Sequence, residues 1–399
     1  MRAVVTLLAL MLSTFAYVTA ETLPIGLLPL IADDLGSTVS EVGLLVTVYG
    51  LVVVLTSVPL TKITHRMPRR LLLCLLLAIF VVGNAASALL DGYGPLMGAR
   101  IVVAMSQAVF WSVVTPAAAA LFSAGARPRA VSLLYAGSTL GALAGVPAGT
   151  WIGQQAGWRV AFLALSVVGA LILVAVLVLM PGAPPGQAET AFGSRPDAGR
   201  YWTIVVYTAL AVAGAFVALT YISPFLTEVS GFGESAVGPL LFVRGLAGLA
   251  GVFAAGWMVA RNGWLTMVVT IGLQAVALLL QWVFGTSATM TVITLAAAGF
   301  SLAAMASGLG VRAMETAPGS TDMASAGTST AFNVGITAGA LLGSLLIPVA
   351  GVRSVALAGA VLSLLAFVVV LLEPRLSTRR RVRADSPSRS PSESSAAGW

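Results

Sequence analysis

The chain contains 399 residues, of which 58% are hydrophobic and only 9% are charged. Its mean hydropathy is +1.00. Because a soluble domain carries roughly a quarter charged residues, this composition excludes a soluble enzyme. The single cysteine, Cys74, and the single histidine, His65, exclude a disulfide framework and a histidine-rich metal site. The net charge of +7 does not indicate nucleic-acid binding, because the basic residues lie at the ends of apolar segments.

Twelve apolar segments are long enough to cross a bilayer as α-helices. They are too long for the ~10-residue strands of an outer-membrane barrel. The sequence therefore predicts an all-α integral membrane protein with twelve transmembrane helices. The expected spans are 4–31, 41–61, 70–90, 95–121, 130–152, 159–180, 202–226, 236–260, 264–284, 288–311, 324–350 and 354–372.

The first segment has a second interpretation as a cleavable signal peptide. A VTA tripeptide precedes Glu21, as small residues precede a cleavage site. The apolar run continues from Leu23 to Ile31, however, and this continuation favours an uncleaved membrane helix.

The distribution of basic residues predicts the orientation in the membrane. Seventeen of the 21 Lys and Arg residues fall in segments on one side, whereas only Arg159 and Arg353 fall on the other side. The remaining two, Arg100 and Arg244, fall inside helices. By the positive-inside rule, we expect a multi-pass protein of the cytoplasmic membrane with both termini in the cytoplasm.

The second half of the sequence repeats the first at a nearly constant offset. At an offset of 195 the glycines 43 and 50 coincide with 238 and 245, and at an offset of 194 the glycines 141, 145 and 149 coincide with 335, 339 and 343. This repeat predicts two six-helix halves, 1–180 and 201–373, related by an axis along the membrane normal. A cytoplasmic linker is expected at 181–200, and a disordered basic, Ser-rich cytoplasmic tail at 374–399.

Three charged side chains fall within apolar segments, namely Glu21, Arg100 and Arg244. Charged groups inside a bilayer are costly, so they face the bundle interior and are functional candidates. Helix geometry places Glu21 and Arg100 at the same depth, roughly 6–8 Å from the midplane. A desolvated carboxylate near a movable cation can alternate between protonated and ionised forms, so this pair is predicted to couple protons to transport. The alternative is a static ion pair that only fixes helix packing.

Several polar and aromatic side chains are candidates to line a substrate cavity. Gln107 and Trp111 lie within about 20° of Arg100 around one helix, and Tyr17 shares a helix face with Glu21. Arg244 is the repeat counterpart of Tyr49 and could attract an anionic or hydroxyl-rich ligand. The complete set is Tyr17, Tyr49, Gln107, Trp111, Arg244 and Asn333. For each of them, helix–helix hydrogen bonding or packing is the alternative.

A run of glycines with a proline marks the fifth predicted helix. Gly141, Gly145 and Gly149 recur every four residues, with Pro147 among them. Small residues at this spacing allow close helix contact, and proline favours a kink. The pattern predicts either a hinge that seals the cavity between the halves or tight packing without a gating role.

These motifs resemble the major facilitator superfamily, and within it the twelve-helix drug:proton antiporter branch. The loop at 61–70 is similar to that branch's first cytoplasmic signature, with Arg66, Arg69 and Arg70 as its basic residues and His65 at its acidic position. Arg100 matches the signature arginine of the fourth helix, and the segment GALAGVPAG resembles the antiporter signature of the fifth.

Segments of the predicted N-terminal half are more similar to bacterial sugar efflux transporters. They include AETLPIGLLPLIADDLG, ARIVVAMSQAVFWSV and GWRVAF. Glu21 matches a glutamate that recurs in these relatives, whereas Gln107 occupies a position where the sugar exporters have histidine. The resemblance implies a facilitator fold and an export function.

Together these observations predict a proton-coupled exporter of a small polar or amphipathic solute, a sugar or sugar-like compound, that works by alternating access. One alternative is an antibiotic or multidrug:proton antiporter, and another is a non-transporting membrane sensor or assembly protein with the same fold. We expect no enzymatic activity, cofactor, metal or nucleic-acid partner. The expected partners are the solute, protons and the lipid bilayer, and the expected state is a monomer. The sequence contains no phosphate-binding glycine motif, which argues against an ATP-driven pump.

Overall fold

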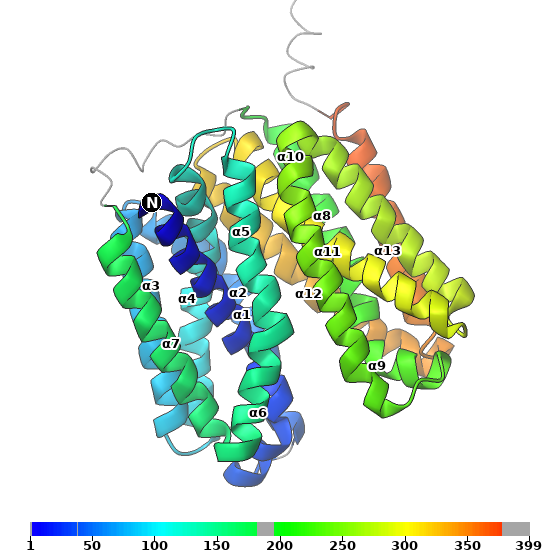
Figure 1. Cartoon of the computed structure of the whole chain (residues 1–399), viewed down its shortest axis with the longest axis horizontal. Helices are drawn as coiled ribbons and strands as arrows, with labels where there is room; N and C mark the ends of the chain where they lie inside the picture. Colours follow the sequence, from blue (N-terminus) through cyan, green and yellow to red (C-terminus); the bar gives the residue numbers. More distant parts are fainter. Residues whose placement is uncertain (1, 38, 182–194, 377–399) are drawn as a thin grey trace, which may run out of the picture.

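The computed structural model describes residues 2–37, 39–181 and 195–376. Every regular element in these ranges is a helix (Figure 1). The N-terminal bundle consists of α1 (Arg2–Leu35), α2 (Val39–Thr64), α3 (Arg69–Leu89), α4 (Tyr93–Ala120), α5 (Arg127–Leu140), the π-helix η1 (Gly141–Gly145), α6 (Val146–Ala156) and α7 (Trp158–Leu179). The C-terminal bundle consists of α8 (Ala198–Leu219), α9 (Ile222–Pro224), the π-helix η2 (Phe225–Val229), α10 (Glu234–Phe284), α11 (Ala288–Thr316), α12 (Thr321–Ala350) and α13 (Ser354–Leu372).

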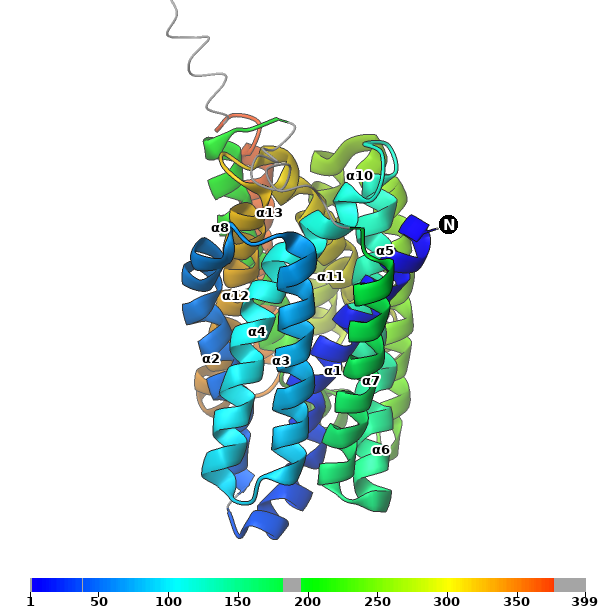
Figure 2. The same cartoon turned by 90° about the vertical axis from the view of Figure 1, so that its left-hand side faces the viewer.

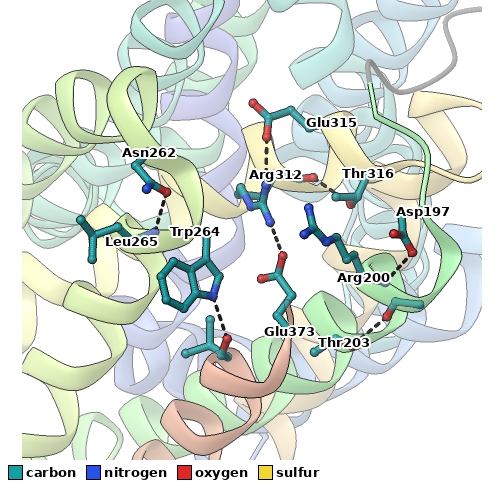
Figure 3. A network of polar contacts seen from close by, with 12 residues as sticks. Asp197, Arg200, Thr203, Asn262, Trp264, Leu265, Arg312, Glu315, Thr316 and Glu373 are labelled. Carbon is teal, nitrogen blue, oxygen red and sulfur yellow. Dashed lines mark hydrogen bonds and ion pairs between the residues drawn. The ribbon is translucent and has the colours of Figure 1, made fainter. Parts of the chain in front are cut away.

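Helix α10 contains two membrane crossings. Its 51 residues would span about 75 Å as one straight helix, far more than a bilayer core. The backbone leaves the helical region at Asn262, whose side-chain Oδ1 accepts a hydrogen bond from the Leu265 N–H at 3.0 Å and so caps the second arm (Figure 3). Eleven helical stretches in the described residues are long and apolar enough to cross a membrane, and this one crosses twice. The predicted all-α fold with twelve crossings is confirmed.

The two bundles have the same helix arrangement. The starts of α2, α4 and α5 at 39, 93 and 127 correspond, at the offset found in the sequence, to the starts of α10, α11 and α12 at 234, 288 and 321. The start of α3 at 69 corresponds in the same way to Gly263, where the second arm of α10 begins. Gly157 and Gly351 share this offset, and both adopt a positive φ before the last helix of their bundle.

Parts of the predicted linker and tail lie outside the described residues. The linker expected at 181–200 overlaps the start of α8, and its residues 182–194 are not among the described ranges. Residues 377–399 of the predicted tail also lie outside them.

Both ends of the described chain lie on one face of the molecule, which we call the terminal face (Figures 1 and 2). The hydrogen bonds that join the two bundles in the described residues lie toward this face. They connect Ser132 Oγ with Ser307 Oγ at 2.8 Å, Ser57 Oγ with the Ala326 carbonyl at 3.5 Å, and Arg69 with the start of α12. A small apolar cluster from α4, α5, α10 and α11 packs beside them. The terminal face is therefore the closed end of the interface between the bundles.

The glycines of the fifth crossing pack against α1 of the same bundle. A Cβ at Gly141 would lie 2.7 Å from the Phe15 carbonyl oxygen, and one at Gly145 would lie 2.0 Å from Thr19 Oγ1. In the other bundle, a Cβ at Gly335 would meet the Ala209 carbonyl at the same 2.7 Å, which is the repeat counterpart of the Gly141 contact. Gly149 packs on Leu23, and Pro147 follows the π-helix at the start of α6. These contacts are intrabundle packing; a hinge role stays a prediction.

Substitution of Gly137 by Ala is expected to destabilise the N-terminal bundle. The added Cβ would lie 2.0 Å from the Met11 carbonyl oxygen, so α1 and α5 would have to separate. Overpacking of this kind costs about 1–3 kcal/mol. Thermal unfolding in detergent should show the loss, whereas Gly43→Ala, where the added Cβ meets nothing within 4 Å, should not lower the midpoint. Equal midpoints for the two variants would contradict this assignment.

Candidate functional site

A chain of hydrogen bonds links three helices of the N-terminal bundle. Gln107 of α4 donates from Nε2 to Glu21 Oε2 of α1 at 2.7 Å. Its Oε1 accepts from the Tyr49 hydroxyl of α2 at 2.6 Å. The Gln107 and Tyr49 side chains are buried, and Glu21 is partly accessible. The amide therefore holds the carboxylate of Glu21 in place without neutralising its charge.

Arg100 lies next to this chain but is not paired with Glu21. Its Nη2 donates to the Ala20 carbonyl at 2.8 Å, and its guanidinium carbon lies 4.6 Å from the centre of the Tyr49 ring. The side chain is completely buried, and its Nε and Nη1 have no hydrogen-bond partner. Within the described residues, no ion pair within 4.0 Å joins Arg100 to Glu21. Two nitrogens of the arginine are therefore available for a new acceptor.

Aromatic side chains lie beside these polar groups. Tyr17 donates its hydroxyl to the Leu76 carbonyl at 2.9 Å, and its ring stacks on Phe110 with centroids 4.2 Å apart. The ring of Trp111, the next residue, lies 5.7 Å from the Tyr135 ring. Tyr17 thus makes contacts between helices, whereas Trp111 is half-buried. Tyr135 could not be predicted as a site residue, because the sequence of its apolar segment does not show that it contacts Trp111 of another helix.

Two further candidates lie in the C-terminal bundle, apart from Glu21. Arg244 of α10 lines a cavity inside that bundle, and it makes no hydrogen bond or ion pair with any described residue. Asn333 of α12 donates to the Ser329 carbonyl of its own helix at 3.0 Å, and it is half-buried. The structure therefore groups Glu21, Arg100, Gln107 and Tyr49 and leaves these two separate.

The basic loop between α2 and α3 connects the two bundles. Arg69 Nη2 donates to Asp322 Oδ1 of α12 at 2.7 Å, and both side chains are only 12% exposed. Arg70 donates to the Leu177 carbonyl of α7, and Arg66 is exposed. Asp322 could not be predicted from the sequence, because its partner Arg69 lies 253 residues away and such a pair leaves no local pattern.

A second ionic cluster lies at the terminal face of the C-terminal bundle. Arg312 of α11 lies between the carboxylates of Glu315 and Glu373 and pairs with both (Figure 3). Next to it, Asp197 accepts from the Arg200 N–H at 3.2 Å and caps α8. Glu373 follows the last residue of α13, so the cluster joins α8, α11 and α13.

The fold and the site together define a multi-pass membrane protein with a buried acid–base cluster, as secondary transporters have. A family model described as Major Facilitator Superfamily matches residues 10–280. This chain belongs to the major facilitator superfamily; it is a transporter and not an enzyme. Transporters of this family act on small-molecule substrates in the membrane.

Relatives of known sequence cover most of the chain. An uncharacterized MFS-type transporter, YtbD, of Bacillus subtilis (strain 168) is 33% identical over 347 residues, which are 85% of this chain and 88% of the relative. A probable sugar efflux transporter of Helicobacter pylori (strain P12) is 31% identical over 357 residues, with 89% and 91% covered.

A solved structure has the same fold. The transporter FucP, crystallised in the outward conformation, superposes with a TM-score of 0.76 over 94% of this chain and 99% of its own. Its sequence identity to this chain is 12%, so this likeness concerns the fold alone.

Proposed function

We propose that this protein exports a small polar or amphipathic solute, a sugar or sugar-like compound, in exchange for protons. The observation that carries the proposal is the position of Glu21, a carboxylate held by the neutral Gln107 near the buried and incompletely paired Arg100. The names of the relatives support a sugar as the substrate.

The free N–H groups of Arg100 suggest how a proton is released. If α1 and α4 shift within the N-terminal bundle and bring Arg100 to the carboxylate of Glu21, the ionised form becomes favoured and a bound proton leaves. If Arg100 returns to the Tyr49 ring, the carboxylate loses the nearby positive charge, keeps only the neutral Gln107 as its partner and accepts a proton. Solute and proton would then occupy the site in turn, which is antiport.

Everted membrane vesicles test this function. With a pH gradient imposed and followed by a quenched fluorophore, addition of the transported sugar should partly dissipate the gradient. Vesicles without the protein should show no such change. If no sugar alters the gradient although the protein is present and folded, proton-coupled sugar export is wrong.

Drug export is a second candidate, and one observation favours it. Trp111 and Tyr135 place two half-buried rings 5.7 Å apart next to the polar cluster, an arrangement that can cover an amphipathic aromatic compound. The same vesicles tested with amphipathic antibiotics in place of sugars would distinguish the two cargoes.

The proposal includes location and topology. We propose that the protein acts as a monomer in the cytoplasmic membrane, with the terminal face and both termini in the cytoplasm. The bacterial relatives and the excess of basic residues on one side support this orientation. With the terminal face closed by Arg69–Asp322 and its neighbours, the solute cavity would open toward the outside.

The Arg69–Asp322 pair is expected to hold the cytoplasmic side closed. Asp322→Asn should weaken the interface by about 1 kcal/mol, which corresponds to a roughly fivefold change in the population of the cytoplasmically open form. The reporter is a Ser57→Cys thiol in a Cys74→Ala background, since Ser57 is buried where α2 meets α12. Its labelling from the cytoplasmic side should accelerate severalfold.

The matched control for Asp322→Asn is Asp91→Asn. Asp91 pairs with Arg159 at 3.1 Å on the opposite face of the molecule, so its removal should leave labelling at position 57 unchanged. If both variants accelerate labelling equally, the pair does not act as a cytoplasmic latch.

A further inference from the structure

The C-terminal bundle contains a small cavity, of about 10 Å³, that the proton-coupling cluster does not use. It lies between α8, both arms of α10 and α11, and its polar lining consists of Arg244, Gln274 and Gln281. The rest of the lining is apolar, and it includes no acidic residue. The charge of Arg244 is therefore not balanced by any residue around the cavity.

This cavity lies at the repeat position of the Glu21 cluster. The offset of 194 or 195 relates Tyr49 to Arg244, Arg100 to Leu295 and Glu21 to Ala215, and each of the second residues lines the cavity. The side chains of Glu21 and Arg100 are replaced by smaller ones without charge, so the corresponding space is left empty. The positive charge at this position comes instead from Arg244, on the arm of α10 that corresponds to α2, the helix that carries Tyr49.

Both glutamines direct unsatisfied polar atoms into buried surroundings. Gln274 is 1% exposed and donates from Nε2 to the Ala211 carbonyl and to Ser363 Oγ, both at 2.8 Å, yet its Oε1 has no partner. Gln281 is 2% exposed, and its Nε2 has no partner. An unsatisfied buried amide is costly, and a bound ligand could offset that cost.

The position of Arg244 depends on a close helix contact. A Cβ at Gly299 would lie 2.8 Å from Arg244 Cγ, so the glycine leaves room for the arginine side chain against α11. The next residue, Gly245, packs on Leu143 of the N-terminal bundle. Arg244 therefore lies inside the C-terminal bundle and beside the interface at which a transporter of this fold binds its solute.

We propose that Arg244, Gln274 and Gln281 bind an oxyanion group, such as the carboxylate of a sugar acid, once α8, α10 and α11 move apart, because the cavity as it stands has room for about one water. Arg244 and Gln281 Nε2 supply N–H donors for the anion, and Gln274 Oε1 accepts from a neighbouring hydroxyl of the ligand. The inference rests on the proposed export function for its choice of a sugar. The oxyanion can belong to the solute itself or be a free inorganic ion.

The test is calorimetric binding to the purified full-length protein in detergent, with glucuronate, glucose and sulfate as probes. We expect glucuronate to bind at least tenfold more tightly than glucose, and Arg244→Gln to weaken glucuronate binding at least tenfold. Arg244→Lys, which keeps the charge, should lose less affinity. Arg261→Gln is the matched control, because Arg261 lies on the same helix, exposed and stacked on Trp257, outside the cavity.

Each outcome decides the proposal. Glucuronate binding that exceeds sulfate binding assigns the oxyanion to the solute, whereas sulfate binding of equal affinity and equal dependence on Arg244 assigns the site to free anions. If no anion binds, or if Arg244→Gln binds glucuronate as the unaltered protein does, the site does not exist. A protein that binds glucuronate through Arg244 but shows no proton-coupled transport would refute the proposed function and leave this site standing.

Discussion

Replacement of Glu21 by Gln is expected to abolish transport driven by a pH gradient. Glutamine keeps the shape of the side chain and can still contact Gln107, but it cannot ionise or carry a proton. Sugar-dependent dissipation of the gradient in everted vesicles should fall to the level of vesicles without the protein. Exchange of labelled for unlabelled sugar in the absence of a gradient should continue, because that reaction needs no net proton movement.

Glu228→Gln is the control for this experiment. Glu228 is an exposed glutamate on η2, far along the chain from the polar cluster, and its replacement removes one negative charge in the same way. It should leave gradient-driven transport intact. If Glu21→Gln retains full gradient-driven transport, the coupling role of Glu21 is wrong, whatever the cargo.

The sequence predicted the charged residues of the site, because apolar membrane helices rarely contain charge. Glu21 and Arg100 stand out because a charged residue in an apolar helix is costly and needs a reason. Gln107 was singled out because it shares a helix face with Arg100, and the structure brings both against Tyr49. Periodicity in one helix can predict such a face, but it cannot predict that an amide rather than a guanidinium contacts the carboxylate.

The residues that sequence reasoning missed are joined by contacts between distant segments. Asp322 lies in the first turn of α12, where an acidic residue is ordinary, and only the structure places Arg69 of the other bundle beside it. Gln274 and Gln281 are polar but uncharged, so in a sequence each is explained equally well by ordinary hydrogen bonds to neighbouring helices. The repeat does not single them out either, because at an offset of 194 Gln274 corresponds to Phe80 and Gln281 to Ser87.

The fold was more predictable than the site because hydropathy fixes the crossings one by one. The long helix α10 shows this. It runs from Glu234 to Phe284 but contains two crossings, with a break in the helical backbone at Asn262. The sequence Arg261-Asn262-Gly263 interrupts the apolar run, and Asn262 provides the cap that starts the next crossing. Local polarity therefore predicts the turn between these two crossings.

Replacement of Arg312 by Met is expected to destabilise the C-terminal bundle by about 3–5 kcal/mol, because it leaves a buried carboxylate without its partner. Glu373 is 1% exposed, and its Oε2 already lacks a hydrogen bond (Figure 3). Burial raises the pKa of the Glu373 carboxyl, and Arg312 opposes that rise. Without the arginine the pKa rises further, so the folded variant binds a proton more tightly than the unfolded chain does. Its stability should therefore fall as the pH increases from about 5 to about 8.

The double variant Arg312→Met with Glu373→Leu distinguishes the effect of the unpaired charge from the effect of lost side-chain packing. Removal of both charges replaces a buried ion pair by apolar side chains, which is often neutral for stability. Thermal unfolding in detergent at the two ends of this pH range should show a large, pH-dependent loss for the single variant and a small, pH-independent change for the double variant. If the double variant is as unstable as the single one at both pH values, the loss comes from packing of the arginine side chain, and the carboxylate of Glu373 is not its cause.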